Sequence, residues 1–216
     1  MDNKKQLFVA IAGNIGAGKT TLTRLISEKL GWRAYYEKVI DNPYLSDFYD
    51  DMNRWSFHLQ IFFLSNRFKS QKEITDWPNS CVQDRSIYED VEIFAQTLYE
   101  GGNMSQVDFD NYCELFSIMV SYLRKPDLII YLETPVENLI ERILNRGRDY
   151  ERTIDPEYLK KLNVAYDNWI TKAENEGFKV LRINTTNKNF EKNEDDLELI
   201  INYIKDMENQ AWLKVD

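Results

Sequence analysis

Residues 7–20 read LFVAIAGNIGAGKT, and this stretch decides the fold. Residues 7–12 form an uninterrupted apolar run of the length expected for a buried strand. The next eight residues match the pattern G-x-x-x-x-G-K-[ST] in full, and a helical pattern follows over residues 19–30. A strand, a glycine-rich loop and a helix in this order predict a site that binds the phosphates of a nucleotide.

The chemistry of such a P-loop comes from its backbone, one lysine and one hydroxyl group. The glycines let successive N–H groups point at phosphate oxygens, and the helix N-terminus adds about half a positive charge. We expect Lys19 to contact the β- and γ-phosphates of ATP and the Thr20 hydroxyl to ligate Mg²⁺. The predicted nucleotide-binding residues of the loop are Gly13, Asn14, Ile15, Gly16, Ala17, Gly18, Lys19, Thr20 and Thr21.

The rest of the chain alternates between short apolar segments and long helical patterns. The further predicted strands are residues 33–37, 80–84, 127–132 and 178–183. The predicted helices after the first are residues 43–76, 87–100, 105–123, 135–146, 155–176 and 194–210. Strands that alternate with helices predict an α/β fold with a parallel sheet covered on both faces.

Composition narrows the class of protein. The 216 residues are 43% hydrophobic, enough for one large core, so we expect a single domain over residues 1–216. The net charge of −9 argues against partners such as nucleic acid polymers and anionic membranes, and no apolar run is long enough to span a bilayer. Only Cys81, Cys113 and His58 offer thiol or imidazole groups, which disfavours a zinc site or disulfide framework and favours the cytoplasm.

Charged residues follow two of the predicted strands. Glu37 ends the second strand, and Asp84-Arg85-Ser86 ends the third. Because ligands of open α/β sheets bind beyond the carboxyl ends of the strands, these residues and the P-loop would open onto one crevice. Glu37 could accept a proton from an attacking hydroxyl, Asp84 could hold Mg²⁺, and Arg85 could stabilise phosphoryl charge. Ordinary surface carboxylates or a strand-end ion pair would give the same pattern.

Two helical patterns carry polar groups among apolar ones. One face of the predicted helix over residues 43–76 collects Phe57, Gln60, Leu64 and Arg67. Gln60 suits the edge of a nucleobase because its amide both donates and accepts, and Asp90 and Phe94 could offer a carboxylate and a ring to the same base. Four arginines gather at the end of a later helix: Arg142, Arg146, Arg148 and Arg152. They predict a lid over the triphosphate at about residues 142–152, or else a solvated basic helix end.

A P-loop is shared by switch GTPases, ATPase motors and small-molecule kinases. The guanine-reading string N-K-x-D is not found, since the nearest string, residues 187–190, lacks the carboxylate.

Five motifs in this order resemble the deoxynucleoside kinase family over nearly the whole chain: residues 13–20, Glu37, the string RWSFHLQ at 54–60, residues 84–86 and residues 146–148. The resemblance implies a P-loop kinase fold with a five-stranded parallel sheet flanked by helices, assembled as a homodimer.

The resemblance also implies a role for each matching residue. The implied catalytic residues are Glu37, Arg85 and Lys19, with Glu37 as general base for the sugar 5′-OH. The implied substrate-binding residues are Glu37, Tyr49, Gln60, Arg67, Arg85, Asp90, Phe94 and Glu151, of which Tyr49 and Glu151 hold the 3′-OH. The implied metal ligands are Thr20 and Asp84, and the implied lid residues are Arg142, Arg146 and Arg148.

Three positions depart from the family pattern. Lys38 follows Glu37 where many members have proline, Asp84 replaces a common glutamate, and Leu59 replaces an aromatic residue. The expected reaction is transfer of the ATP γ-phosphoryl to the 5′-OH of a small-molecule deoxynucleoside, with deoxyadenosine first and deoxyguanosine or deoxycytidine as alternatives. Two other functions stay open at this point: a thymidylate-kinase-like nucleoside monophosphate kinase and a nucleotide-binding switch.

Overall fold

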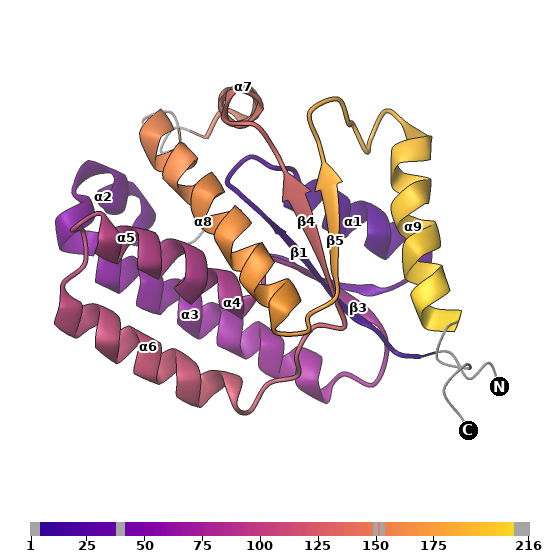
Figure 1. Cartoon of the computed structure of the whole chain (residues 1–216), viewed down its shortest axis with the longest axis horizontal. Helices are drawn as coiled ribbons and strands as arrows, with labels where there is room; N and C mark the ends of the chain where they lie inside the picture. Colours follow the sequence, from indigo (N-terminus) through magenta and orange to yellow (C-terminus); the bar gives the residue numbers. More distant parts are fainter. Residues whose placement is uncertain (1–4, 38–41, 149–150, 152–153, 210–216) are drawn as a thin grey trace.

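The computed structural model describes residues 5–37, 42–148, 151 and 154–209, and its centre is a five-stranded sheet (Figure 1). The strands are β1 (Phe8–Gly13), β2 (Arg33–Tyr35), β3 (Cys81–Asp84), β4 (Leu128–Glu133) and β5 (Val180–Asn184). Their order is β2-β3-β1-β4-β5, and every pairing is parallel. The predicted α/β fold is therefore confirmed, with the P-loop strand at the centre of the sheet.

Helices cover both faces of this sheet. They are α1 (Lys19–Leu30), α2 (Leu45–Asp50), α3 (Met52–Asp76), α4 (Ile87–Glu89), the π-helix η1 (Asp90–Ala95), α5 (Gln96–Glu100), α6 (Gln106–Val120), α7 (Val136–Arg146), α8 (Pro156–Asn175) and α9 (Glu194–Asn209). In Figure 1, α1 and α9 lie together on one side of the strands, and α3, α6 and α8 lie on the other. None of the helices in the described ranges combines the length and apolar character needed to cross a membrane.

Three differences between the predicted and the observed helices and strands affect the region of the predicted site residues. The single helix predicted over residues 43–76 is two helices, because the backbone of Asp51 turns away at φ −144° and its side chain caps α3 by accepting from the Arg54 N–H at 3.1 Å. The second strand ends at Tyr35, so Glu37 lies in the segment that follows it. The helix predicted over residues 87–100 contains six residues of π-helix, which begin at Asp90.

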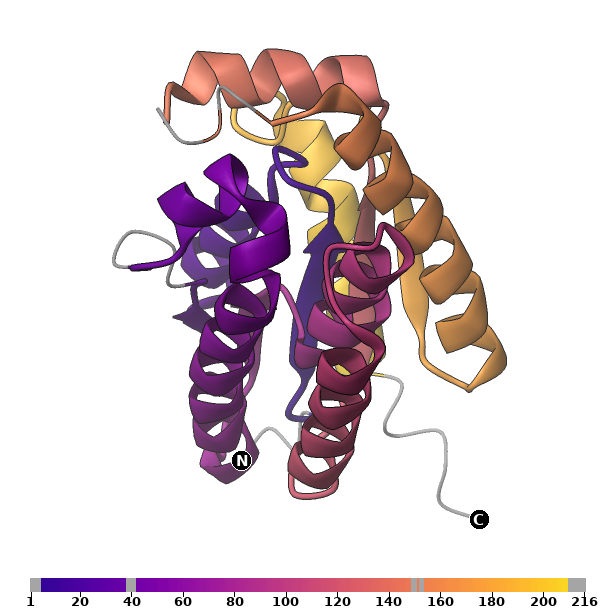
Figure 2. The same cartoon turned by 90° about the vertical axis from the view of Figure 1, so that its left-hand side faces the viewer.

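The register of the sheet brings the functional motifs to one edge. Gly13 at the end of β1 pairs with Leu132 of β4, and Ile11 pairs with Asp84 at the end of β3. The P-loop and Asp84 therefore leave neighbouring strands at the same end. Figure 2 shows α7 lying across this end of the molecule, above the loop that follows β1.

Gly16 is the point where the P-loop passes beneath α7. Its φ of +82° lies in the left-handed region that favours glycine, and an added Cβ would stand 3.0 Å from the Leu139 carbonyl oxygen and 3.0 Å from Ile143 Cγ1. The loop conformation and the close approach of α7 thus both require a residue without a side chain.

We expect Gly16→Ala to lower the free energy of unfolding by about 1–3 kcal/mol, for two reasons. The new methyl group would lie too close to the backbone of α7, and alanine would be strained at this positive φ. Gly177→Ala is the matched control: its φ is +86°, but an added Cβ there has no neighbour within 4 Å. Chemical denaturation of both variants measures the two costs. Equal losses would show that α7 does not constrain the loop.

Candidate active site

A cavity of about 610 Å³ opens at the carboxyl end of β1 and β3. Most of the predicted site residues line it, namely Ile15, Gly16, Gly18, Lys19, Thr20, Thr21, Glu37, Tyr49, Gln60, Asp84, Arg85, Asp90, Phe94, Arg142, Arg146, Arg148 and Glu151. Further lining residues were not among those predicted from the sequence: Tyr36, Leu45, Phe48, Phe63 and Tyr158. Leu59, which departs from the family pattern, also lines the cavity. One cavity thus joins the phosphate-binding loop, the acidic residues and the polar groups expected to read a base.

The P-loop lysine is buried at the bottom of this cavity. Lys19 Nζ donates to the Asn14 carbonyl at 2.8 Å, and the residue is only 7% exposed. Burial lowers the pKa of Lys19 to about 8, and the nearby positive charge of Arg85 acts in the same direction. An incoming phosphate would restore a negative partner to this ammonium group.

Thr20 and Asp84 form the part of the site that fits a magnesium ion. The Thr20 hydroxyl donates to Asp84 Oδ2 at 2.6 Å, while Asp84 Oδ1 is buried and has no hydrogen-bond partner. Burial raises the pKa of Asp84. The described residues contain no cluster of three His, Cys, Asp or Glu side chains for a metal. Magnesium at a P-loop needs only such a hydroxyl and carboxylate, with phosphate oxygens and waters as its other ligands.

Glu37 lines the same cavity as the P-loop and lies between two guanidinium groups. Arg67 donates to Glu37 Oε1 at 2.5 Å, and Arg85 Nε lies 3.2 Å from the same oxygen. Burial alone would raise the pKa of Glu37, but the positive charges of Arg85, Arg67 and Lys19 outweigh it and lower the pKa to about 2. The carboxylate therefore stays ionised at every physiological pH.

The backbone of Arg85 is strained. Its φ of +68° is unusual for a residue with a side chain, and no other non-glycine residue in the described ranges has a positive φ. Arg67 holds this conformation by donating to the carbonyl oxygens of Asp84 at 3.1 Å and Arg85 at 3.2 Å. The Arg85 guanidinium then lies over the Phe94 ring, 4.4 Å from its centroid. Strain of this kind is typical of functional sites, where the surroundings fix one geometry.

The polar groups expected to read a base lie at the far end of the cavity. Gln60 is 2% exposed, and Asp90 accepts from Arg67 Nε at 3.3 Å and from its Nη2 at 3.4 Å. Burial raises the pKa of Asp90 to about 6, although Arg67 opposes this shift. Arg67 itself does not line the main cavity, so any influence it has on a base passes through Asp90.

The lid arginines fall into two groups by what they contact. Arg142 donates to the carbonyl oxygens of Ala17 at 3.2 Å and Thr185 at 3.0 Å, which joins α7 to the P-loop. Arg146 and Arg148 both donate to Glu151, the residue expected to hold the sugar 3′-OH. Gly147 ends α7 in the left-handed conformation. Arg152 and Lys38 lie outside the described residues.

The sequence analysis missed two buried polar residues around the site, Glu89 and Tyr166, and gave Asn14 only a role in binding the nucleotide. The Asn14 side chain bonds the Leu159 carbonyl at 2.9 Å and Asn163 Oδ1 at 2.7 Å, so this part of the loop is tied to α8. Glu89 and Tyr166 are buried behind Arg85. The spacing S-x-x-E from Ser86 to Glu89 could have predicted a capping box. No local sequence pattern indicates that Tyr166 would contact the site.

The geometry agrees with what comparison with known proteins finds. The deoxynucleoside kinase family model matches residues 9–208. The chain belongs to the deoxynucleoside kinase family. It is therefore an enzyme that binds nucleoside and nucleotide substrates and transfers a phosphoryl group from ATP to a deoxynucleoside. The monophosphate-kinase and switch alternatives are not favoured.

Individual relatives differ in the base they are named for. A deoxyadenosine/deoxycytidine kinase of Bacillus subtilis is 42% identical over 205 residues, which cover 93% of this chain and 92% of the relative. A deoxyguanosine kinase of the same organism is 33% identical over 202 residues, covering 93% and 97%. The structure of a deoxyadenosine kinase from M. mycoides with bound dATP is similar, with a TM-score of 0.81 at 30% identity, and the match covers 93% of this chain and 100% of that one.

We expect ATP binding to weaken above pH 8, because the pKa of Lys19 in the free protein is about 8 and its charge is lost above that value. The γ-phosphate is already fully ionised there, so the affinity should fall by up to about tenfold per pH unit. Calorimetric titration between pH 7 and 9.5 measures this profile. The Lys19→Arg variant keeps its positive charge over this range, so its affinity for ATP should not fall as the pH rises, whatever its absolute affinity. A flat wild-type profile would contradict the shifted pKa.

Proposed function

We propose that this deoxynucleoside kinase acts with Mg²⁺ on deoxyadenosine, with Glu37 and Arg85 at the 5′-OH. The observation that carries the proposal is the position of Glu37, which lies in one cavity with the P-loop and is ion-paired to Arg85. A hydroxyl placed between Glu37 and Lys19 would meet a hydrogen-bond acceptor on one side and the γ-phosphate on the other.

A carboxylate with a pKa of about 2 is a weak base, which defines how Glu37 acts. Phosphoryl transfer passes through a loose transition state, so the attacking hydroxyl keeps its proton until late in the reaction. Glu37 would orient this hydroxyl by accepting its hydrogen bond and take the proton as the new P–O bond completes. Arg85 and Lys19 would stabilise the charge on the transferred group.

Magnesium fits beside the P-loop, where the free Oδ1 of Asp84 and the hydroxyl of Thr20 would hold it. When bound, the ion neutralises charge on the β- and γ-phosphates. The shorter carboxylate of Asp84, compared with a glutamate, leaves room for a water between ligand and ion. Arg142, Arg146 and Arg148 would close over the phosphates, while Tyr49 and Glu151 would hold the sugar 3′-OH.

The preference for deoxyadenosine rests on Asp90 and Gln60. Ionised Asp90 only accepts hydrogen bonds, so it favours bases with an exocyclic amine at that edge, as in adenine and cytosine. Arg67 keeps Asp90 oriented through two N–H groups. Phe94 would stack on one face of the base, and Leu59 would offer an aliphatic contact to the other.

We also propose that the enzyme works as a single domain and as a homodimer in the cytoplasm. Val107, Ile118 and Tyr122 are 68%, 54% and 69% exposed, and helical spacing puts them on one face of α6 and its end. Large apolar side chains exposed on one face favour pairing with a second copy. Both cysteines are free thiols, which suits a reducing compartment. Sedimentation velocity tests the dimer, with a monomer at micromolar concentration as the contrary result.

The direct test of the function is to incubate the enzyme with γ-labelled ATP, Mg²⁺ and each of the four deoxynucleosides. We expect labelled 5′-monophosphate with deoxyadenosine as the best acceptor. Parallel reactions with 5′-monophosphates as acceptors test the alternative. Label transferred only to monophosphates would indicate a nucleoside monophosphate kinase, and slow hydrolysis without acceptor would indicate a switch.

Glu37→Gln should keep nucleoside binding but lower kcat by about 10²- to 10⁴-fold, because the amide cannot take the hydroxyl proton. Steady-state kinetics and nucleoside binding measure the two effects separately. Glu73→Gln is the matched control, since Glu73 is also ion-paired to an arginine, Arg33, but on the exposed surface of α3. A Glu37→Gln enzyme with wild-type kcat would remove Glu37 from the reaction.

Asp90→Asn should change base preference, because the amide can donate where the carboxylate only accepts. The ratio of kcat/KM for deoxyadenosine to that for deoxyguanosine should fall by about tenfold, equivalent to one unpaired buried group. The four deoxynucleosides assayed separately give this ratio. If activity falls equally on all four, Asp90 does not read the base.

A further inference from the structure

The side of Arg85 that faces away from Glu37 is held by two buried residues from other parts of the chain. Arg85 Nη1 donates to the Tyr166 hydroxyl at 3.0 Å, and this hydroxyl donates to Glu89 Oε2 at 2.7 Å. Arg85 Nη1 also lies 4.0 Å from Glu89 Oε2. Tyr166 and Glu89 are fully buried, and neither lines the main cavity. They therefore contact the arginine without access to a substrate.

Glu89 holds the backbone next to Arg85 as well. Its Oε1 accepts from the Ser86 N–H at 2.8 Å in a capping box that begins α4 immediately after the strained residue. The Glu89 carboxylate thus fixes the direction of the chain after Arg85. Through Tyr166 it also fixes the orientation of the Arg85 guanidinium. Burial keeps the pKa of Tyr166 well above 10, so the phenol is neutral and can accept from Arg85 while donating to Glu89.

Tyr166 reaches Arg85 from α8, which also supports the P-loop. Asn163 lies one turn earlier on the same face of α8, and its Oδ1 accepts from Asn14 in the loop at 2.7 Å. One helix face therefore contacts both the phosphate-binding loop and the arginine beside the acceptor hydroxyl. The two halves of the reaction site share a single rigid support.

We propose that Tyr166 and Glu89 are positioning residues that fix the Arg85 guanidinium for phosphoryl transfer, an inference that rests on the proposed role of Arg85. An arginine side chain has many rotamers, and on the cavity side Arg85 contacts the Glu37 carboxylate and the Phe94 ring. With Tyr166 and Glu89 on the opposite side, the guanidinium is oriented before substrate arrives. A preorganised donor avoids the cost of reorganisation during the reaction.

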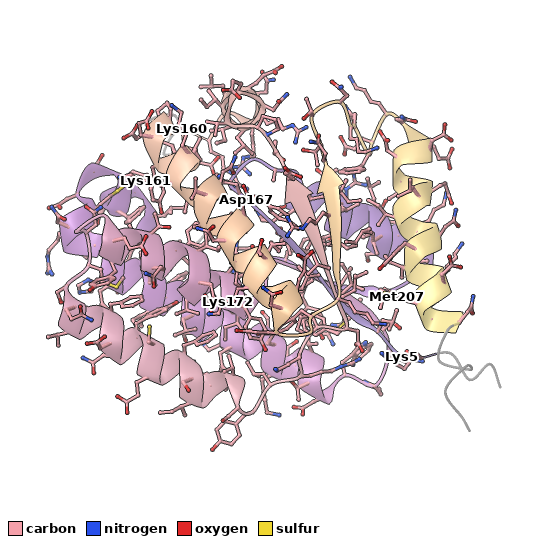
Figure 3. The ribbon with its side chains drawn as sticks, in the orientation of Figure 1. Lys5, Lys160, Lys161, Asp167, Lys172 and Met207 are labelled. Atoms are coloured by element: carbon pink, nitrogen blue, oxygen red, sulfur yellow. The ribbon has the colours of Figure 1, made fainter. Side chains whose placement is uncertain are left out.

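Tyr166→Phe tests this by removing one hydroxyl and keeping the ring. We expect kcat to fall by about tenfold, with KM for both substrates within about twofold of wild type, because orientation and not binding is lost. Tyr131→Phe is the matched control. Tyr131 is buried and its ring stacks on that of Tyr166 with centroids 5.8 Å apart, but its hydroxyl donates to Asp167 at 3.0 Å. Asp167 lies on α8, where Figure 3 labels it. Its kcat should stay within about twofold of wild type.

A double-mutant cycle with Arg85→Lys separates positioning from a general structural role. Arg85→Lys alone should lower kcat strongly, and adding Tyr166→Phe should then change kcat by less than about twofold, because the bond it removes is already gone. A full tenfold loss in both backgrounds would overturn the positioning role. Wild-type kcat in Arg85→Lys alone would instead refute the proposed role of Arg85.

Glu89→Gln provides a second variant if Tyr166→Phe proves unstable. Glutamine can still serve in the capping box through its amide oxygen, but its amide nitrogen then faces the phenol and leaves the Tyr166 O–H without an acceptor. We expect the same fall in kcat at nearly unchanged KM. Full activity in this variant would contradict the chain from Glu89 through Tyr166 to Arg85.

Discussion

Arg67 uses all five of its N–H groups inside the protein, and the rest of the site depends on these bonds. They go to Glu37, to both oxygens of Asp90 and to the carbonyl oxygens of Asp84 and Arg85. A planar guanidinium can make such a fork of bonds only if its acceptors lie in fixed directions. Arg67 thus sets the relative positions of the residues proposed to activate the hydroxyl, read the base and hold the metal.

Charge explains why neighbouring carboxylates of this site behave differently. The side chain of Glu37 is 18% exposed and Asp90 is 2% exposed, yet the pKa of Glu37 is lowered to about 2 and that of Asp90 is raised to about 6. Glu37 meets two guanidiniums and an ammonium group, whereas Asp90 shares Arg67 with Glu37 and lies deeper in apolar surroundings. An acidic protein of net charge −9 thereby gathers its buried cations where a triphosphate would enter.

The sequence predicts the parts of this protein that local patterns define. Residues 7–20 carry strand, loop and helix signals within one short stretch, and the glycine that ends α7 is equally local. The break at Asp51 was missed because its capping side chain sits within a continuous helical pattern. The resemblance to the deoxynucleoside kinase family implies that Arg67 binds the substrate. That it lies behind the cavity wall follows from tertiary packing, as does the contact of Tyr166 with Arg85 across 81 positions.

We propose above all that the acceptor hydroxyl lies between Glu37 and the γ-phosphate, beside a preoriented Arg85. A crystal structure with deoxyadenosine, Mg²⁺ and a non-hydrolysable ATP analogue tests this most directly. The account predicts the 5′-oxygen within about 3.2 Å of a Glu37 oxygen and in line with the γ-phosphorus, with Arg85 still bonded to Tyr166. A nucleoside whose 5′-oxygen points away from Glu37, or an Arg85 released from Tyr166, would contradict it.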